Sequence, residues 1–251
     1  MRDAPAGRAA ALARNLAAVR TRIDAACGSA GRDPAEITLI AVTKTYPALD
    51  VLDLAGLGLT DFGENRDQEA APKAAAVSAA GQPVTWHFIG QLQTNKAPSV
   101  AGYADFVHSV DRIRLVRALG AAARAAGRTL TCLVQVSLDP ADADGPALAA
   151  GRGQQARGGV PPALLREVAA AVAAEEGLRL GGLMAVAPLG ADPGTAFAPL
   201  RQLSEAVQSV SATATLVSAG MSGDLEAAVA SGATHLRIGT ALLGDRRPPV
   251  L

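Results

Sequence analysis

The stretch Ile37-Thr38-Leu39-Ile40-Ala41-Val42-Thr43-Lys44 sets a pattern that the rest of the chain repeats. Its β-branched and aliphatic residues, bounded by Pro34 and Pro47, predict a fully buried strand of a parallel sheet. Lys44 stands where that strand ends. A solvated lysine is the simplest interpretation, because lysines are mostly exposed. The alternative is an amine at the mouth of a barrel, ready to form a Schiff base with an aldehyde.

The composition argues against several classes of protein. The 251 residues carry a formal net charge of zero, without a basic stripe, so nucleic acid is not an expected partner. No apolar run reaches the roughly 18 residues of a membrane span, and no signal peptide is recognisable. We therefore expect a soluble, cytoplasmic protein. Cys27 and Cys132 lack the spacing of metal ligands and are expected to be buried thiols.

Short apolar segments alternate with helical patterns along the whole chain. The expected strands cover 37–44, 59–62, 84–90, 106–110, 130–136 and 180–186, then 214–223 and 235–240 together with their loops. The expected helices cover 8–27, 50–58, 111–126 (capped by Asp111), 161–176, 193–211 and 224–230, and a further helix opens at 64–69. This α/β alternation predicts a single (β/α)8 TIM barrel over 1–251, with an extra N-terminal helix. The Gly- and Pro-rich segment 137–159 is expected to be a long surface-loop insertion.

The carboxyl ends of the strands mark the expected site, because barrels of this kind place their active sites there. Loops after the last two strands are rich in the residues that bind phosphate through backbone N–H groups and hydroxyls. The candidates are Ser218, Gly220, Met221, Ser222, Gly239 and Thr240. The glycines have a simpler explanation as well, since glycine permits tight turns. Lys44 and these loops together predict a ligand with an aldehyde and a phosphate, and pyridoxal phosphate has both.

Arg237, beside the second of these loops, is the candidate partner for the ring nitrogen of that cofactor. A purely structural role for a buried arginine would require a carboxylate. The sequence alone does not place one.

Seven short motifs carry a resemblance to a known family: Ala41-Val42-Thr43-Lys44, Phe62-Gly63-Glu64-Asn65, Trp86-His87-Phe88-Ile89-Gly90 with Leu92-Gln93-Thr94-Asn95-Lys96, His108-Ser109-Val110-Asp111-Arg112, Gly182-Leu183-Met184, Ser218-Ala219-Gly220-Met221-Ser222 and Arg237-Ile238-Gly239-Thr240. Over about 37–244 the chain resembles the pyridoxal phosphate homeostasis proteins, the YggS/PROSC-like family. The resemblance implies a fold-type III barrel like the N-terminal domain of alanine racemase. It implies a Schiff base between the cofactor and Lys44, phosphate held by Ser218 and the Gly239-Thr240 loop, and Arg237 near the pyridine nitrogen. The implied role is balancing pools of pyridoxal phosphate and amino acids, with no established turnover.

Two positions depart from the family pattern near the mouth of the expected site. Arg66 replaces a usual tyrosine, and Gln91 replaces a common proline. Asn65 is expected either to line the site or to cap the following helix. Met184 is expected to pack in the core or to touch the cofactor ring.

The family resemblance and the tyrosine content favour a cofactor carrier over a catalyst. Alanine racemase needs a second proton-transfer tyrosine from another domain, whereas the tyrosines here are Tyr46 and Tyr103. His87 and His108 are structural or act as acid/base groups. We expect no robust turnover, a monomer, and apo enzymes as possible recipients of the cofactor. The alternatives are a low-activity amino-acid racemase and a Schiff-base aldolase acting on a phosphosugar.

Overall fold

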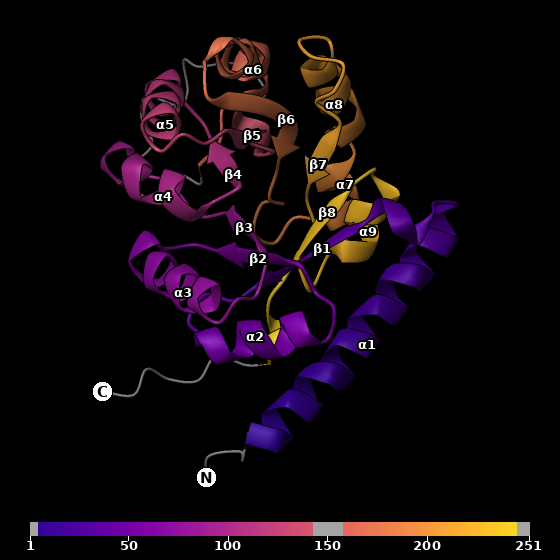
Figure 1. Ribbon diagram of the computed structural model, residues 1–251. Helices are drawn as coiled ribbons and strands as arrows, with labels where there is room; N and C mark the ends of the chain where they lie inside the picture. The colour runs from indigo at the N-terminus through magenta and orange to yellow at the C-terminus, as the bar shows by residue number, and fades with distance from the viewer. Residues whose placement is uncertain (1–4, 143–157, 245–251) are drawn as a thin grey trace.

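The computed structural model describes residues 5–142 and 158–244 (Figure 1). Within these ranges eight parallel strands close into a barrel in chain order, and helices cover its outside. The prediction of a (β/α)8 barrel with an additional N-terminal helix is confirmed. Most of the predicted insertion at 137–159 lies outside the described residues, but its ends meet where Val136 pairs with Val160.

The strands follow the apolar segments of the sequence closely, and parallel pairing brings all their carboxyl ends to one rim of the barrel. Strand β1 pairs with both β2 and β8, which closes the barrel and sets Ile40 beside Asp61 on one side and Arg237 on the other. The strands are β1 (Thr38–Val42), β2 (Asp61–Glu64), β3 (Thr85–Phe88), β4 (Phe106–Val110), β5 (Leu130–Gln135), β6 (Leu178–Met184), β7 (Leu216–Ser218) and β8 (His235–Ile238).

Most helices lie between successive strands and pack their apolar sides on the sheet, whereas the first precedes β1 and the last follows β8. They are α1 (Pro5–Ala30), α2 (Ala48–Gly56), α3 (Asp67–Ala79), α4 (Ala97–Tyr103), α5 (Ile113–Ala125), α6 (Leu165–Ala174), α7 (Pro193–Phe197), α8 (Leu200–Gln208), α9 (Leu225–Ala230) and α10 (Thr240–Leu243). Short 3-10 turns accompany them: η1 (Pro34–Glu36), η2 (Thr94–Lys96), η3 (Pro140–Asp142) and η5 (Pro162–Leu164).

Helix α1 packs against the segments that follow β7 and β8. It runs past the outside of the barrel and contacts α2, α9 and α10 (Figure 1). Arg22 makes a two-fold ion pair with Glu226 and donates to the carbonyl of Ser222 at 3.1 Å. The amide of Asn15 donates to the carbonyl of Leu242 at 2.9 Å. The extra helix therefore holds the segments that follow β7 and β8 in place.

The apolar core fills the layer between the sheet and the helices. Phe62 and Leu54 are fully buried there, and each such side chain contributes about 1.5–3 kcal/mol of hydrophobic stabilisation. Cys27 and Cys132 are free and buried, as predicted, and burial raises the pKa of the Cys132 thiol to about 12. Among the described residues, no helix has the length and apolar character that crossing a membrane requires.

Three local predictions were wrong for identifiable reasons. The helix expected over 193–211 is divided into α7 and α8 at Pro199, because a proline inside a helix removes a hydrogen bond and clashes with the preceding turn. The cap of α5 is Arg112, while Asp111 forms an ion pair with that arginine instead. Helix α4 was not predicted, since its Ala97-Pro98 start lacks an apolar period.

Candidate functional site

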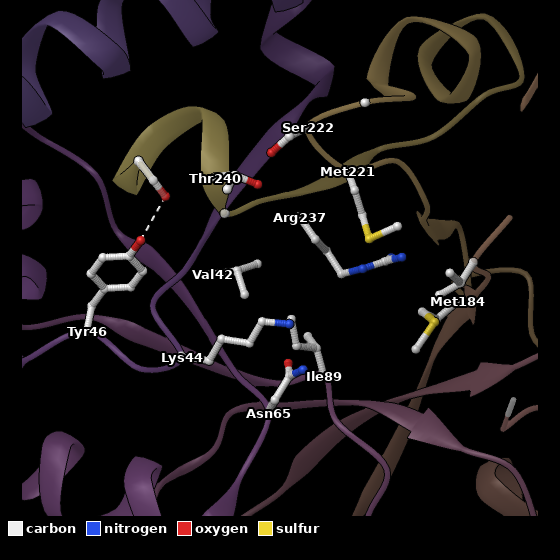
Figure 2. Close-up of a pocket in the computed structure, with 14 residues that line it drawn as sticks. Val42, Lys44, Tyr46, Asn65, Ile89, Met184, Met221, Ser222, Arg237 and Thr240 are labelled. Carbon is white, nitrogen blue, oxygen red and sulfur yellow. Dashed lines mark hydrogen bonds between the residues drawn. The ribbon is translucent and has the colours of Figure 1, made fainter. Parts of the chain in front are cut away.

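A cavity of about 400 Å³ opens at the carboxyl rim of the barrel (Figure 2). Its volume falls within the range of small-molecule sites, roughly 300–1,000 Å³. Eight of the predicted site residues line it: Lys44, Asn65, Met184, Met221, Ser222, Arg237, Gly239 and Thr240. The structure therefore brings these eight predicted residues together in one cavity, although they come from strands at opposite sides of the barrel.

Lys44 stands on a tight turn that is held from both sides. The N–H of Tyr46 donates to the carbonyl of Thr43 at 3.0 Å and closes the turn. Thr45 has a left-handed backbone with φ of 69°, which is costly for a β-branched residue. Its N–H donates to the carboxylate of Glu69 at 3.0 Å. Figure 2 shows the side chain of Lys44 directed into the cavity, above Asn65.

A buried polar network lies directly behind this turn. The ammonium of Lys73, on α3, donates to the carboxylate of Glu64 and to the carbonyl of Thr43, the latter at 2.7 Å. The hydroxyl of Thr43 donates to the same carboxylate oxygen at 2.6 Å. Burial raises the pKa of Glu64, and the charge of Lys73 opposes that rise. The network fixes the residue before Lys44, so it aims the lysine from outside the barrel.

Asn65 lies in the cavity wall and does not cap α3. The cap is Arg66, so the interpretation of Asn65 as an N-cap was wrong. The side-chain oxygen Oδ1 of Asn65 is buried and makes no hydrogen bond within the described residues. Gly90 permits its position, because a Cβ there would lie only 2.0 Å from the backbone oxygen of Asn65. This amide oxygen is therefore available to a bound molecule.

Arg237 contributes a positive charge to the wall opposite Asn65. Its guanidinium donates to the hydroxyl of Ser218 at 2.6 Å and to the carbonyl of Ala185 at 2.9 Å. The residue is only 4% exposed, and burial lowers the pKa of its guanidinium to about 10. Arg237 is still a cation at neutral pH. The sulfur-containing side chains of Met184 and Met221 lie beside it (Figure 2).

The loops after β7 and β8 meet at the other end of the cavity. The hydroxyl oxygen of Ser222 accepts from the N–H of Ala241, at the start of α10, at 3.2 Å. Gly239 and Thr240 line the same region, and a Cβ on Gly239 would only reach ordinary contact with Val42. This end of the cavity offers backbone N–H groups and hydroxyls, the groups that bind phosphate in this fold.

Two predicted phosphate residues do not line the cavity. Ser218 is fully buried below it and is bonded to Arg237. Gly220 has a φ of 90°, and a Cβ there would lie 2.6 Å from the side chain of Ala228, so packing explains this glycine. Lys96, for which a second role in cofactor transfer was left open, lies outside the cavity with its ammonium 3.8 Å from Asp67.

The tyrosines occupy structural positions. The ring of Tyr46 borders the cavity, but its hydroxyl donates to the carbonyl of Gly244 at 2.8 Å (Figure 2). Tyr103 belongs to α4, on the outside of the barrel. The hydroxyl of Tyr46 is therefore directed toward Gly244 and away from Lys44. Within the described ranges, no cluster of His, Cys, Asp and Glu is arranged to hold a metal ion.

Sequence reasoning missed several lining residues and the support behind Lys44. Val42, Ile89, Val186 and Gly223 also line the cavity. The alternation of side chains in β1 would have placed Val42 on the same face as Lys44. Lys73 could have been singled out because the chain has only three lysines. Its contact with Glu64 could not be predicted, because it depends on how α3 packs.

Known proteins resemble this chain over nearly its whole length. Residues 9–247 match the family described as alanine racemase, N-terminal domain. The pyridoxal phosphate homeostasis protein of Mycobacterium tuberculosis is 43% identical over 249 residues, covering 92% of each chain. The chain belongs to the pyridoxal phosphate homeostasis protein family.

Solved structures place this chain among related barrels. PipY of Synechococcus elongatus, in a structure with pyridoxal phosphate bound, is 32% identical with a TM-score of 0.75, covering 93% of this chain and all of PipY. Alanine racemase of Corynebacterium glutamicum is 14% identical with a TM-score of 0.65, which shows a shared fold. The chain spans 63% of that racemase.

Proposed function

We propose that this protein binds pyridoxal phosphate at the carboxyl rim, joined to Lys44 through its aldehyde, and takes part in pyridoxal phosphate homeostasis. One observation carries the proposal: Lys44, Arg237 and the loop residues Ser222, Gly239 and Thr240 line a single cavity. The name of the Mycobacterium tuberculosis relative and the bound state of PipY support the same cofactor.

The residues in the cavity fit this cofactor. The cavity holds one amine from Lys44 at the end of β1 and one cation from Arg237 on β8. The buried Oδ1 of Asn65 has no hydrogen-bond donor among the described residues, and a bound molecule would provide one. The Gly239 position leaves open space that a larger residue would partly fill.

Each side chain then has a defined task. When bound, the cofactor supplies an aldehyde that condenses reversibly with an amine. Lys44 supplies that amine, held by the turn between Thr43 and Tyr46. The hydroxyls of Ser222 and Thr240, with nearby backbone N–H groups, would hold the phosphate. Arg237 would hold the ring nitrogen unprotonated, because two positive charges would otherwise lie together in a buried wall.

The same cavity supports a role in holding and passing on the cofactor. Two-base racemisation requires a second acid/base group across from the lysine, which typically contributes 10²–10⁴-fold to the rate. Both tyrosines of the chain lie in structural positions, and the hydroxyl of Tyr46 is engaged with Gly244. We therefore extend the proposal to apo enzymes as recipients of the cofactor, to a monomeric state and to a cytoplasmic location.

A visible spectrum of the purified protein with added pyridoxal phosphate tests the cofactor assignment. We expect an absorption band near ~420 nm, lost on borohydride reduction with the cofactor mass added at Lys44. Lys44→Ala should abolish the band, and the matched control Lys96→Ala should keep it. A full-strength band in Lys44→Ala would overturn the assignment.

A transfer assay tests the role in homeostasis. The loaded protein is mixed with an apo form of a pyridoxal phosphate enzyme, and recovery of that enzyme's activity is timed against the same total amount of free cofactor. Faster recovery from the loaded protein supports transfer. Recovery no faster than with free cofactor, together with loss of optical activity in D- or L-alanine, would instead favour a racemase.

A further inference from the structure

A chain of hydrogen bonds crosses the inside of the barrel below the cavity. The guanidinium of Arg237 lies 2.6 Å from the Oγ of Ser218, which lies 2.9 Å from Nδ1 of His108. Nε2 of His108 lies 2.9 Å from Nδ1 of His87, and Nε2 of His87 lies 2.8 Å from the carboxylate of Asp61. We call these five residues the interior relay.

The relay joins strands from opposite sides of the barrel. His108 is on β4 and Ser218 is on β7, which are three strands apart in the closed sheet, so their contact passes through the interior. Asp61 is the first residue of β2, at the amino rim, and its side chain is 20% exposed. Arg237 lies in the wall of the cavity at the carboxyl side. The relay therefore links the two ends of the barrel.

The chemistry of the groups fixes the direction of the hydrogens. A guanidinium only donates, so Ser218 accepts from Arg237 and turns its own hydrogen to Nδ1 of His108. Burial lowers the pKa of His108 well below its usual value, so this ring is neutral and carries one hydrogen. With Nδ1 accepting from Ser218, that hydrogen lies on Nε2. That hydrogen points to Nδ1 of His87, whose own hydrogen then lies on Nε2 and faces Asp61. Among the arrangements in which each ring carries one hydrogen, only this one makes all four contacts hydrogen bonds.

The two ends of the relay carry opposite charges. Burial acts to raise the pKa of Asp61, but the hydrogen bonds from His87 and Thr60 outweigh it and lower the pKa overall, so the carboxylate is ionised. Within the described ranges, no carboxylate lies within 4 Å of Arg237. The charge of Asp224 acts on Arg237 through space and opposes the effect of burial on its pKa. A buried cation without a hydrogen-bonded carboxylate is nevertheless expensive. The relay connects Arg237 to a carboxylate through three intermediate side chains.

We propose that Asp61, His87 and His108 are positioning residues for Arg237, which they hold in the cavity wall through Ser218, and that Asp61 thereby sets how tightly the cavity binds the cofactor ring. The second half of this proposal rests on the proposed function, because Arg237 contributes to binding only where the cavity takes pyridoxal phosphate. Asp61 itself lies at the far rim and does not line the cavity.

The first experiment tests the relay without any cofactor. The chain holds three histidines, so nitrogen spectra of the full-length protein labelled with 15N-histidine contain three rings, and His235→Asn identifies one of them. At about pH 8, above the usual titration range of imidazole, we expect His87 and His108 both to carry their hydrogen on Nε2. Asp61→Ala should change the tautomer balance of His87. An imidazolium at His87, a hydrogen on Nδ1 of either ring, or unchanged spectra in Asp61→Ala would overturn the relay.

The second experiment measures the dissociation constant of pyridoxal phosphate by titration. Asp61→Ala removes both the acceptor and the charge, and we expect binding about 10-fold weaker, whereas Asp61→Asn keeps an acceptor and should weaken it about 3-fold. The matched control is Asp105→Asn. Asp105 is a carboxylate at the same rim that pairs with Arg128, outside the relay, and its variant should bind as the wild type does.

The outcomes separate the two proposals. If the wild type does not bind the cofactor, the proposed function fails while the tautomer result still decides the relay. If the wild type binds and Asp61→Ala binds equally well, the positioning role is refuted. A merely structural role would lower the melting temperature of the Asp61 and Asp105 variants alike and leave the dissociation constant unchanged, which also refutes it.

Discussion

Acid should destabilise this protein through His235, and the size of the effect follows from its burial. His235 begins β8, is 7% exposed, and contacts the rings of His87 and Phe106 with centroids 6.3 and 6.4 Å away. Burial lowers the pKa of His235 to about 4. An unfolded histidine titrates near ~6.5.

The sign of the effect follows from proton binding. Between about pH 6.5 and the folded value, the unfolded chain binds a proton at His235 that the folded chain does not. The free energy of unfolding therefore falls as the pH falls through this window. A shift of roughly 2.5 units at 1.36 kcal/mol each corresponds to about 3 kcal/mol in total, of which about 2 kcal/mol is lost between about pH 7 and about pH 4.5. His108, whose pKa is also lowered by burial, adds a loss of the same sign.

Urea titrations followed by circular dichroism, on wild type and His235→Asn at both pH values, measure this effect. Taking the difference between the two proteins removes the contributions they share, including the opposite one from Glu64, whose pKa burial raises. We expect the wild type to lose about 2 kcal/mol more than the variant on acidification. An equal loss in both proteins would refute the assignment of the buried neutral ring.

Three further substitutions test how the site is built. Thr45→Gly should relieve the strain of the left-handed backbone at this turn and change the free energy of unfolding by less than about 1 kcal/mol. The same variant should slow borohydride trapping of the cofactor on Lys44. Faster trapping would show that the strained turn does not orient the lysine. Lys73→Met should cost about 3–5 kcal/mol in urea unfolding, because it leaves Glu64 buried without its cation, and adding Glu64→Leu should recover part of that loss. Gly90→Ala should weaken cofactor binding by about 10-fold or more in a titration, since its Cβ has no room against the cavity wall.

The sequence was sufficient for the barrel and for most of the cavity because both depend on local rules. Each strand is a short apolar run followed by a helical period, and eight repeats allow few folds other than a barrel. Lys44, Asn65 and Arg237 were found because parallel strands bring their carboxyl ends to one rim, whatever the exact register. The prediction of pyridoxal phosphate rested on Lys44 and the two loops, and the resemblance to a known family implied the same ligand.

The depth of each residue inside the barrel was harder to predict. Ser218 and Ser222 stand four positions apart in the same motif, yet Ser218 lies below the cavity and Ser222 lies in its wall. The difference depends on where β7 ends and the loop turns, which the residues alone do not determine. The chain of hydrogen bonds from Arg237 to Asp61 was not predicted either, because it depends on contacts that form only when the barrel closes.

In this barrel, the side chains that stabilise the fold and those that support the binding cavity occupy different layers. Barrels of this fold usually fill their interior with layers of branched apolar side chains. Here histidine, serine, arginine and aspartate side chains occupy much of that space, and the apolar core lies instead between the sheet and the helices. Polar interiors contribute less to stability than apolar ones, because each hydrogen bond replaces one made to water. The polar side chains inside the barrel are therefore better explained by their support of Arg237, whose cation lies in the wall of the cavity, than by a contribution to stability.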